Sequence, residues 1–137
     1  AAIGALLLNG VGDTIRVSIT GEPVREVYAA KRLLRSLELD KNYVNVISCP
    51  TCGRCRWSSA SLAEKVNRAV ENINKPLTIA VMGCVVNGPG EAADADIGIA
   101  GAEDYCVIFK KGKVERRVAA ADAEAEFLKE IADILND

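Results

Sequence analysis

The chain has 137 residues, half of them apolar, which is enough to bury the core of one domain of common size. Its 17 basic residues stand against 19 acidic ones, and the net charge of -2 gives no general attraction to nucleic acid or to an anionic membrane. Histidine is absent, which excludes histidine metal sites and cysteine–histidine or serine–histidine nucleophile pairs.

The chain opens with an apolar stretch, residues 1–8, that is far shorter than the ~20 residues needed to cross a bilayer and lacks a basic leader. We therefore expect a soluble protein with no membrane partner. Residues 14–19 alternate apolar and polar side chains, which predicts a strand. Helical spacing of apolar residues follows from Pro23 to about Leu39.

A second strand and helix follow, and then another strand. Residues 44–48 predict a short buried strand, and a capping-box pattern from Ser61 to Glu64 predicts the start of a helix that runs to about Asn74. Residues 77–82 predict the next strand. If these two strands are parallel neighbours, a right-handed crossover brings their carboxyl-terminal ends to one edge of the sheet.

The last third of the chain predicts three more strands and a helix. They are strands at 96–100, 105–109 and 114–118, the last two joined by a hairpin turn, and a helix whose apolar stripe runs from Phe127 to Leu135. The predicted fold class is therefore α/β (α+β), a mixed sheet with helices packed on it.

Cysteines follow the ends of two predicted strands. Cys49 and Cys52 form a C-x2-C pair whose sulfurs lie on one turn and point at a common metal or cluster, and Cys84 follows the strand at 77–82. Five cysteines are an odd count, and no secretory signal precedes them, which disfavours a disulfide framework. We expect a reducing compartment, the cytoplasm, and three thiolates that converge at one sheet edge.

Three sulfur ligands are one short for a 4Fe-4S cluster or a tetrahedral zinc site. The fourth comes from Cys55, Cys106, a carboxylate or a small molecule. The carboxylate best situated is Glu91, seven residues after Cys84 in a Gly-Pro-Gly loop whose glycines allow a close approach. An oxygen ligand, unlike a fourth thiolate, leaves one iron able to bind a substrate oxygen.

Other interpretations of the cysteines stay open on this evidence. A structural zinc fits a C-x2-C pair with a distant third cysteine as well as iron–sulfur does, and a thiol-disulfide site needs a thioredoxin-like flank that the sequence does not contain. Cys55 extends the pair to C-x2-C-x2-C, the ferredoxin spacing, which allows an all-cysteine site with Cys84. Cys106 alternates within an apolar strand and is expected to be a buried small side chain.

Two stretches resemble a known enzyme family. Residues 47–54 read Ile-Ser-Cys-Pro-Thr-Cys-Gly-Arg, and residues 82–91 read Met-Gly-Cys-Val-Val-Asn-Gly-Pro-Gly-Glu. Both resemble 4-hydroxy-3-methylbut-2-enyl diphosphate synthase of the non-mevalonate isoprenoid pathway, as do residues 10–20 and 97–101. The resemblance covers essentially the whole chain.

The resemblance implies a 4Fe-4S cluster ligated by Cys49, Cys52, Cys84 and Glu91, in a domain (residues 44–137) like that of sulfite and nitrite reductases. It implies an oxidoreductase that opens and dehydrates 2-C-methyl-D-erythritol 2,4-cyclodiphosphate to 4-hydroxy-3-methylbut-2-enyl diphosphate, with two electrons from ferredoxin or flavodoxin. In the family, substrate oxygen displaces the glutamate at the unique iron, and Asn87 by its place in the motif approaches the substrate. The alternative is a ferredoxin-like or structural zinc module with an all-cysteine site and no catalysis.

Family members begin with a TIM barrel that holds the diphosphate, and residues 1–41 resemble only its last strand and helix. By resemblance, the cluster domain of one subunit closes over the barrel of its partner in a homodimer. We therefore expect this chain to bind a cluster and, alone, to turn over little or no substrate. We also expect residues 1–20 to be disordered, repacked or paired with another chain, because a solitary barrel strand is an exposed edge.

Overall fold

The computed structural model describes residues 1–136, which divide into two compact units, Ala1–Tyr43 and Val44–Asp137. The first unit contains helices α1 (Ala2–Leu8) and α2 (Val24–Ser36), with an irregular segment between them. The strand predicted at 14–19 is wrong. Residues 1–43 contain no strand at all. An extended segment there therefore has no neighbouring strand with which to exchange backbone hydrogen bonds.

The helix predicted after Pro23 is confirmed as α2, but it ends a few residues before the predicted Leu39. Glu38 takes a left-handed φ of 57°. The Leu39 N–H then donates to the Leu34 carbonyl at 2.9 Å. A left-handed residue followed by such a bond is a common way for a helix to end, because it satisfies a carbonyl that the helix leaves free.

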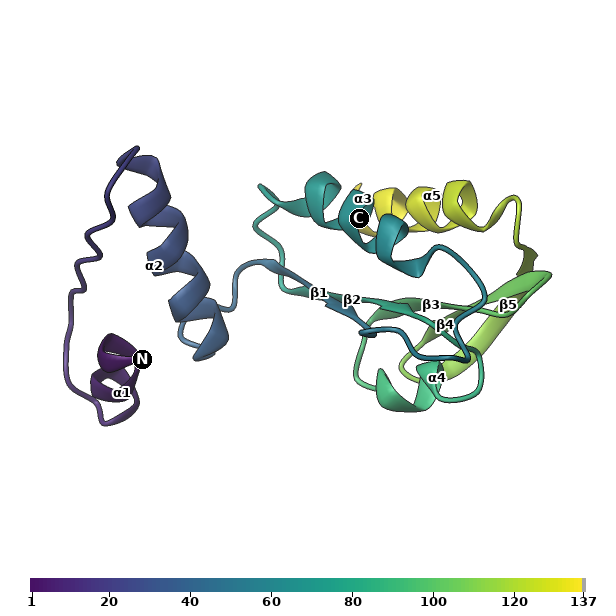
Figure 1. The fold of residues 1–137 in the computed structure, drawn as a ribbon, viewed down its shortest axis with the longest axis horizontal. Coiled ribbons are helices and arrows are strands. Elements are labelled where there is room, and N and C mark those ends of the chain that lie inside the picture. The colour runs from purple at the N-terminus through teal and green to yellow at the C-terminus, as the bar shows by residue number, and fades with distance from the viewer. Residues whose placement is uncertain (137) are drawn as a thin grey trace. The chain divides into compact units, whose positions relative to one another are not determined.

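In the described part of the second unit, five strands form one mixed sheet in the order β1-β2-β3-β4-β5 (Figure 1). β1, β2 and β3 run parallel to one another, and β4 and β5 complete the sheet in antiparallel fashion. The strands are β1 (Val44–Ser48), β2 (Leu77–Met82), β3 (Ile97–Gly101), β4 (Tyr105–Lys110) and β5 (Lys113–Ala119). The predicted mixed α/β fold is confirmed.

The two long helices of this unit, α3 (Ser59–Val70) and α5 (Ala123–Asn136), lie on one face of the sheet, and the short α4 (Gly88–Glu91) lies on the other (Figure 1). We call these the α3/α5 face and the α4 face. The predicted capping box is wrong, because α3 begins before Ser61, and Ser58 at its N-cap makes no side-chain cap hydrogen bond. Burial of Ser59, which is 2% exposed, favours the earlier start.

The α3/α5 face carries the larger core. Its buried side chains include Leu62 and Val66 of α3, Phe127 of α5, and Ile79 and Ile99 of the sheet. The α4 face is lined mainly by small residues and contains Ala80, Met82, Ala92, Ala95, Ala100, Val107 and Phe109. The two faces therefore differ in the bulk of the side chains that they bury.

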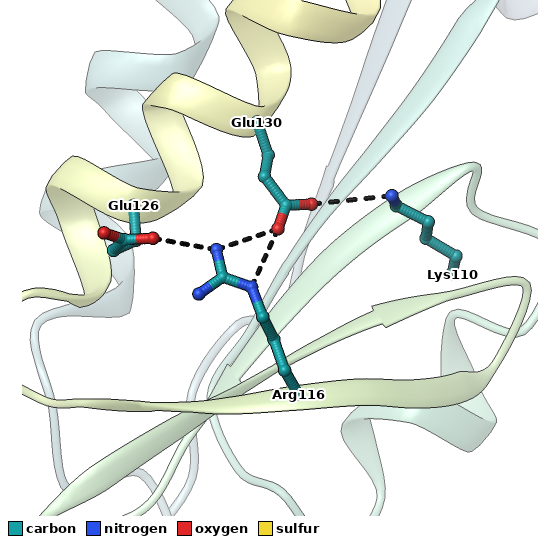
Figure 2. Close-up of polar contacts among 4 residues, drawn as sticks. All are labelled: Lys110, Arg116, Glu126 and Glu130. Atoms are coloured by element: carbon teal, nitrogen blue, oxygen red, sulfur yellow. Dashed lines mark hydrogen bonds and ion pairs between the residues drawn. The ribbon is translucent and has the colours of Figure 1, made fainter.

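Ion pairs join α5 to the antiparallel end of the sheet. Figure 2 shows Arg116 of β5 between Glu126 and Glu130 of α5, with Lys110 of β4 on the far side of Glu130. The Arg116 guanidinium lies 2.9 Å from a Glu126 oxygen and 2.8 Å from a Glu130 oxygen, and the Lys110 ammonium lies 3.6 Å from Glu130. These contacts fasten the C-terminal helix over β4 and β5.

The parallel strands end together at one edge of the sheet. In their registers Ser48 lies beside Val81, and Met82 lies beside Ala100. The segments after β1 and β2 thus leave the sheet on the same side, as the crossover rule predicts. Among residues 1–136, no helix combines the length and the apolar character that a membrane span needs.

Candidate metal centre

The first cysteine segment leaves β1 and is held to the sheet at its start. The Cys49 N–H donates to the Val81 carbonyl at 3.2 Å, which continues the β1–β2 pairing by one residue. The Cys55 N–H then donates to the Cys52 carbonyl at 2.9 Å and closes a turn. Cys49 is partly buried, whereas Cys52 at the tip is exposed.

Thr51, between the first two cysteines, adopts a left-handed φ of 61°. A β-branched residue is uncommon in this conformation, because its side chain crowds the backbone. Strained residues of this kind persist where the surrounding structure holds them, and they cluster at functional sites. The turn between Cys49 and Cys52 therefore contains a backbone conformation that a threonine rarely adopts by itself.

The second segment leaves β2 and folds back onto the sheet end. The Val85 N–H donates to the Gly101 carbonyl at 3.2 Å, and the Gly88 N–H donates to the Cys84 carbonyl at 3.0 Å. The stretch predicted as a loop, residues 83–91, therefore ends in the single helical turn α4. Pro89 is compatible with this turn because it lies at its start, where its missing N–H is not needed.

α4 can lie close to the sheet because position 88 has no side chain. A Cβ atom there would come within 2.8 Å of the Met82 Cβ and 2.9 Å of the Ala100 Cβ, both of which belong to the α4 face. This contact fixes the height of the turn that carries Asn87 and Glu91. The amide Nδ2 of Asn87 donates to Oε1 of the exposed Glu91 at 3.3 Å.

The two segments meet at Gly83, the residue before Cys84. A Cβ placed on Gly83 would lie 3.3 Å from the Cys55 sulfur and 3.5 Å from the Cys49 sulfur. Both thiols therefore face the base of the second segment. The sequence predicted that the two cysteine segments would meet. It did not indicate that the thiols nearest to Gly83 would be those of Cys55 and Cys49.

The positive charge of Arg54 acts on three of the predicted ligands. Its guanidinium has a raised pKa, first because it is hydrogen-bonded to Cys52, and further because of the negative charges of Cys52, Cys84 and Glu91. Reciprocally, the pKa of the Cys52 thiol is lowered, first by a hydrogen bond from the Arg54 backbone and then by one from its side chain. Hydrogen bonds to the sulfur and a nearby positive charge favour the thiolate of Cys52, which is the form that binds metal.

The described residues 1–136 contain no group of three cysteine, aspartate or glutamate side chains that is arranged to hold one metal ion. In a 4Fe-4S cluster each protein ligand binds a different iron, so the ligands surround the cluster rather than converge on one point. Thiolates are the ligands that iron–sulfur clusters take, and a carboxylate supplies a hard oxygen donor. By the chemistry of their donors, Cys49, Cys52, Cys84 and Glu91 fit such a cluster.

Three residues near the site were not predicted to act there as they do. The Cys55 sulfur donates to the Trp57 carbonyl at 3.3 Å and lies 3.4 Å from the Ser59 hydroxyl. The Trp57 indole nitrogen donates to the Met82 carbonyl at 3.3 Å. Trp57 is the only tryptophan in the sequence, and its position just after the cysteines is the signal that could have identified it.

Cys106 of β4 lies within the core and is fully buried, as predicted. Burial raises the pKa of its thiol to about 11, since the charged form cannot be hydrated there. It belongs to the α3/α5 face and packs as a small apolar side chain.

The chain is similar to known proteins along nearly its whole length. The profile of the family described as the GcpE protein C-terminal domain matches residues 45–133. The chain's curated relatives include three proteins with the name 4-hydroxy-3-methylbut-2-en-1-yl diphosphate synthase (flavodoxin). The protein of Caldanaerobacter subterraneus subsp. tengcongensis is 55% identical over 98% of this chain and 38% of its own length.

The other two relatives agree closely with the first. The protein of Desulfotalea psychrophila is 51% identical over 97% of this chain and 36% of its own length. The protein of Clostridium tetani is 50% identical over 96% of this chain and 38% of its own length. The chain thus spans less than two-fifths of the length of these relatives.

Proposed function

The chain belongs to the family of the GcpE protein C-terminal domain, and on that premise we propose that residues 44–137 form the 4Fe-4S domain of a reductase. The proposed ligands are Cys49, Cys52, Cys84 and Glu91. The observation that carries the proposal is that two cysteine segments leave adjacent parallel strands at one edge and meet at Gly83. The proposed fold relationship is to the iron–sulfur domains of sulfite and nitrite reductases.

The proposed reaction is the one implied by the name of the relatives, 4-hydroxy-3-methylbut-2-en-1-yl diphosphate synthase. It is the reductive opening and dehydration of 2-C-methyl-D-erythritol 2,4-cyclodiphosphate to 4-hydroxy-3-methylbut-2-enyl diphosphate, in isoprenoid biosynthesis. When bound, the cluster supplies electrons one at a time and a Lewis-acidic iron for the departing oxygen.

Two residues of the second segment have the properties that this reaction needs. Glu91 is exposed and accepts a hydrogen bond from a neutral amide, so its carboxylate is free to exchange with a substrate oxygen. Asn87 is partly buried and carries an amide that donates hydrogen bonds. Its proposed role is to donate to the substrate oxygen once Glu91 has moved away.

The remaining parts of the proposal concern what lies outside this domain. Flavodoxin, which the relatives' name includes, or ferredoxin is the proposed electron donor. Residues 1–41 are proposed to be a remnant of the end of a TIM barrel that binds the diphosphate in a homodimer, with α2 as its last helix. Because the chain spans about 38% of such a relative, it is proposed to bind the cluster but to turn over little substrate alone.

The alternative, a zinc or ferredoxin-like module with an all-cysteine site, has less support. A structural zinc requires four donors around one point. No three such side chains surround one point in residues 1–136. An all-cysteine site would need the thiol of Cys55 as a further ligand, but this thiol instead donates a hydrogen bond to the Trp57 carbonyl.

Anaerobic reconstitution with iron and sulfide tests the proposal. We expect broad visible absorption and about four irons per chain. Glu91→Gln should keep the three thiolates but change the magnetic resonance spectrum of the reduced cluster, whereas Glu115→Gln, an exposed glutamate on β5, should not. A colourless protein with one tightly bound zinc, or an unchanged spectrum in the Glu91 variant, would contradict the ligand set.

Replacement of single cysteines by serine distinguishes the proposed ligands from the other thiols. Cys84→Ser is expected to lower the iron content strongly, because serine is a poor ligand for iron–sulfur clusters. Cys55→Ser should retain the cluster, since a serine hydroxyl can also donate to the Trp57 carbonyl. Strong loss of iron in Cys55→Ser as well as in Cys84→Ser would favour the all-cysteine site, which needs both thiols.

A further inference from the structure

Trp57 bridges the two cysteine segments at the carboxyl edge of the parallel strands. It follows the first segment directly, and its indole nitrogen donates to the carbonyl of Met82, the last residue of β2. Cys84 lies two residues after Met82. One side chain from the first segment thus holds the strand from which the second segment departs.

The ring of Trp57 also lies directly on Gly101, the last residue of β3. A Cβ atom on Gly101 would come within 2.2 Å of the indole Cδ1 and 2.3 Å of the indole Nε1. The same Gly101 accepts a hydrogen bond from Val85, the residue after Cys84, at 3.2 Å. Gly101 is therefore an anchor shared by both cysteine segments, and only a residue without a side chain leaves room for the indole.

The backbone of Trp57 is tied to the first segment as well. Its carbonyl accepts a hydrogen bond from the Cys55 thiol at 3.3 Å, and the Ser59 N–H also donates to it at 3.0 Å. Ser59 is buried and opens α3. The position of Cys55 beside Gly83 is therefore set by the residue that also contacts β2 and β3.

We propose that Trp57 is a positioning residue of the cluster site, which clamps the cysteine turn onto Gly101 and Met82 and so holds Cys49 and Cys52 opposite Cys84. This inference rests on the proposed iron–sulfur function and deepens it. Trp57 touches neither substrate nor iron in this role. It acts by fixing the spacing of the two ligand segments and by covering the strand ends with an apolar ring.

Both effects bear on a bound cluster. Residues that orient ligands typically change metal affinity by about 10- to 100-fold when they are removed. An apolar ring also limits the approach of water, and the solvent exposure of an iron–sulfur cluster is one of the factors that set its reduction potential. Because reduction adds negative charge, loss of the ring should raise the potential by letting water stabilise the reduced state.

The test compares Trp57→Phe, Trp57→Ala and Gly101→Ala with the wild-type chain after anaerobic reconstitution. The measured quantities are the rate of iron loss to a chelator and the reduction potential. We expect Trp57→Ala to lose iron about 10-fold faster or more, at a raised potential, and Trp57→Phe to lie between it and the wild type. Val114→Ala, an exposed side chain on β5, is the control and should change neither quantity.

Gly101→Ala supplies an independent arm. Its new methyl group occupies the place of the indole, so it should reproduce the effect of Trp57→Ala. In the double variant the two effects should not add, because the second substitution then removes nothing more. Iron loss and potential that match the wild type in Trp57→Ala, or fully additive effects in the double variant, would overturn the clamp.

A second measurement on the metal-free chain separates this inference from the function on which it rests. The alkylation rate of Cys55 should rise in Trp57→Ala, because the thiol loses the fixed carbonyl against which it is held. An unchanged rate would overturn the clamp even where the wild type binds its cluster. A wild-type chain that takes up no iron while Cys55 alkylation rises as expected would overturn the cluster role and the proposed function, and leave the clamp as a feature of the fold.

Discussion

The two faces of the sheet in the second unit are built on different principles. On the α3/α5 face, large side chains such as Phe127 and Leu62 fill the space between the strands and two long helices. On the α4 face, alanines and a glycine let one helical turn lie against the strands. The ring of Phe109 on that face lies over Gly98, because position 98 has no side chain. A Cβ atom on Gly98 would lie 2.2 Å from the ring.

The difference separates stability from the candidate site. The α3/α5 face buries the larger share of apolar side chains, which is the main favourable contribution to folding. The α4 face buries less but brings the turn with Asn87 and Glu91 close to the strand ends. Substitutions on the first face should therefore change the free energy of unfolding most, and substitutions on the second should change cluster retention most.

Phe127→Ala tests the α3/α5 face and has the largest expected effect on stability. Phe127 is fully buried, so its truncation leaves a cavity and should lower the free energy of unfolding by about 3–5 kcal/mol. Urea unfolding measures the loss. Val114→Ala, at a side chain that is 54% exposed, is the matched control and should cost less than about 0.5 kcal/mol. Equal costs would mean that this face is not the main source of stability.

Gly88→Ala tests the α4 face against Gly90→Ala two residues away. The new methyl at 88 collides with Met82 and Ala100, whereas a Cβ at 90 meets nothing within 4 Å. Overpacking of this kind costs about 1–3 kcal/mol, and we expect Gly88→Ala to lose iron from the reconstituted chain as well. Gly90→Ala should retain the wild-type stability and the iron. Similar iron retention in the two variants would show that α4 need not lie close to the sheet.

Cys106 gives the α3/α5 face a dependence on pH. Its thiol has a pKa of about 11 in the folded chain, against 9.0 for an ordinary cysteine, so the unfolded chain loses this proton first as pH rises. The contribution of the protonated Cys106 thiol to the free energy of unfolding is therefore fully present below pH 9. It is lost between about pH 9 and 11, and the loss is about 1.4 kcal/mol at pH 10.

Cys106→Ala should remove that part of the alkaline loss. The measurement is urea unfolding at pH 8 and pH 10, with the difference between the two values compared across variants. Val118→Ala is the control, because it truncates a buried side chain of the same core and removes no titratable group. If the Cys106 variant loses as much stability as the wild type between these pH values, burial of the thiol is not the cause.

The smallest expected effect concerns the ion pairs of Figure 2. Arg116→Met keeps the aliphatic stem but removes the charge that joins β5 to Glu126 and Glu130. Since Arg116 is 38% exposed, we expect a loss of about 1 kcal/mol or less, and less still at about 1 M salt. Lys41→Met, whose 4.0 Å pair with Glu38 is far more exposed, should change nothing measurable. A salt-independent loss would point to packing of the stem instead.

Local patterns predicted most strands of the second unit, and the reason is burial. Residues 44–48 and 77–82 are short apolar runs between breakers, and they form β1 and β2 with the predicted bounds. The same kind of pattern failed at 14–19, because a strand also needs a neighbour, and residues 1–43 contain none. Alternation of apolar and polar side chains is therefore not sufficient to form a strand.

Helix starts were harder to predict, because tertiary contacts compete with local signals. Ser61 and Glu64 have the spacing of a capping box, yet α3 begins at Ser59. The Ser59 N–H donates to the Trp57 carbonyl, and Trp57 is held by Met82 across the sheet edge. α4 was missed for a related reason, since Gly-Pro-Gly has little helix propensity and the turn depends on its packing against Ala100.

The sequence by itself determined the chemistry of the candidate site: the kinds of donor, their spacing along the chain, and their location after two predicted strands. Those features follow from residue identity and from the periodicity of short segments. Only the tertiary structure decided that Cys55 faces Gly83 and that Trp57 lies on Gly101. Contacts between residues so far apart in the sequence depend on how the strands are ordered and how closely their ends approach, and no local pattern encodes that distance.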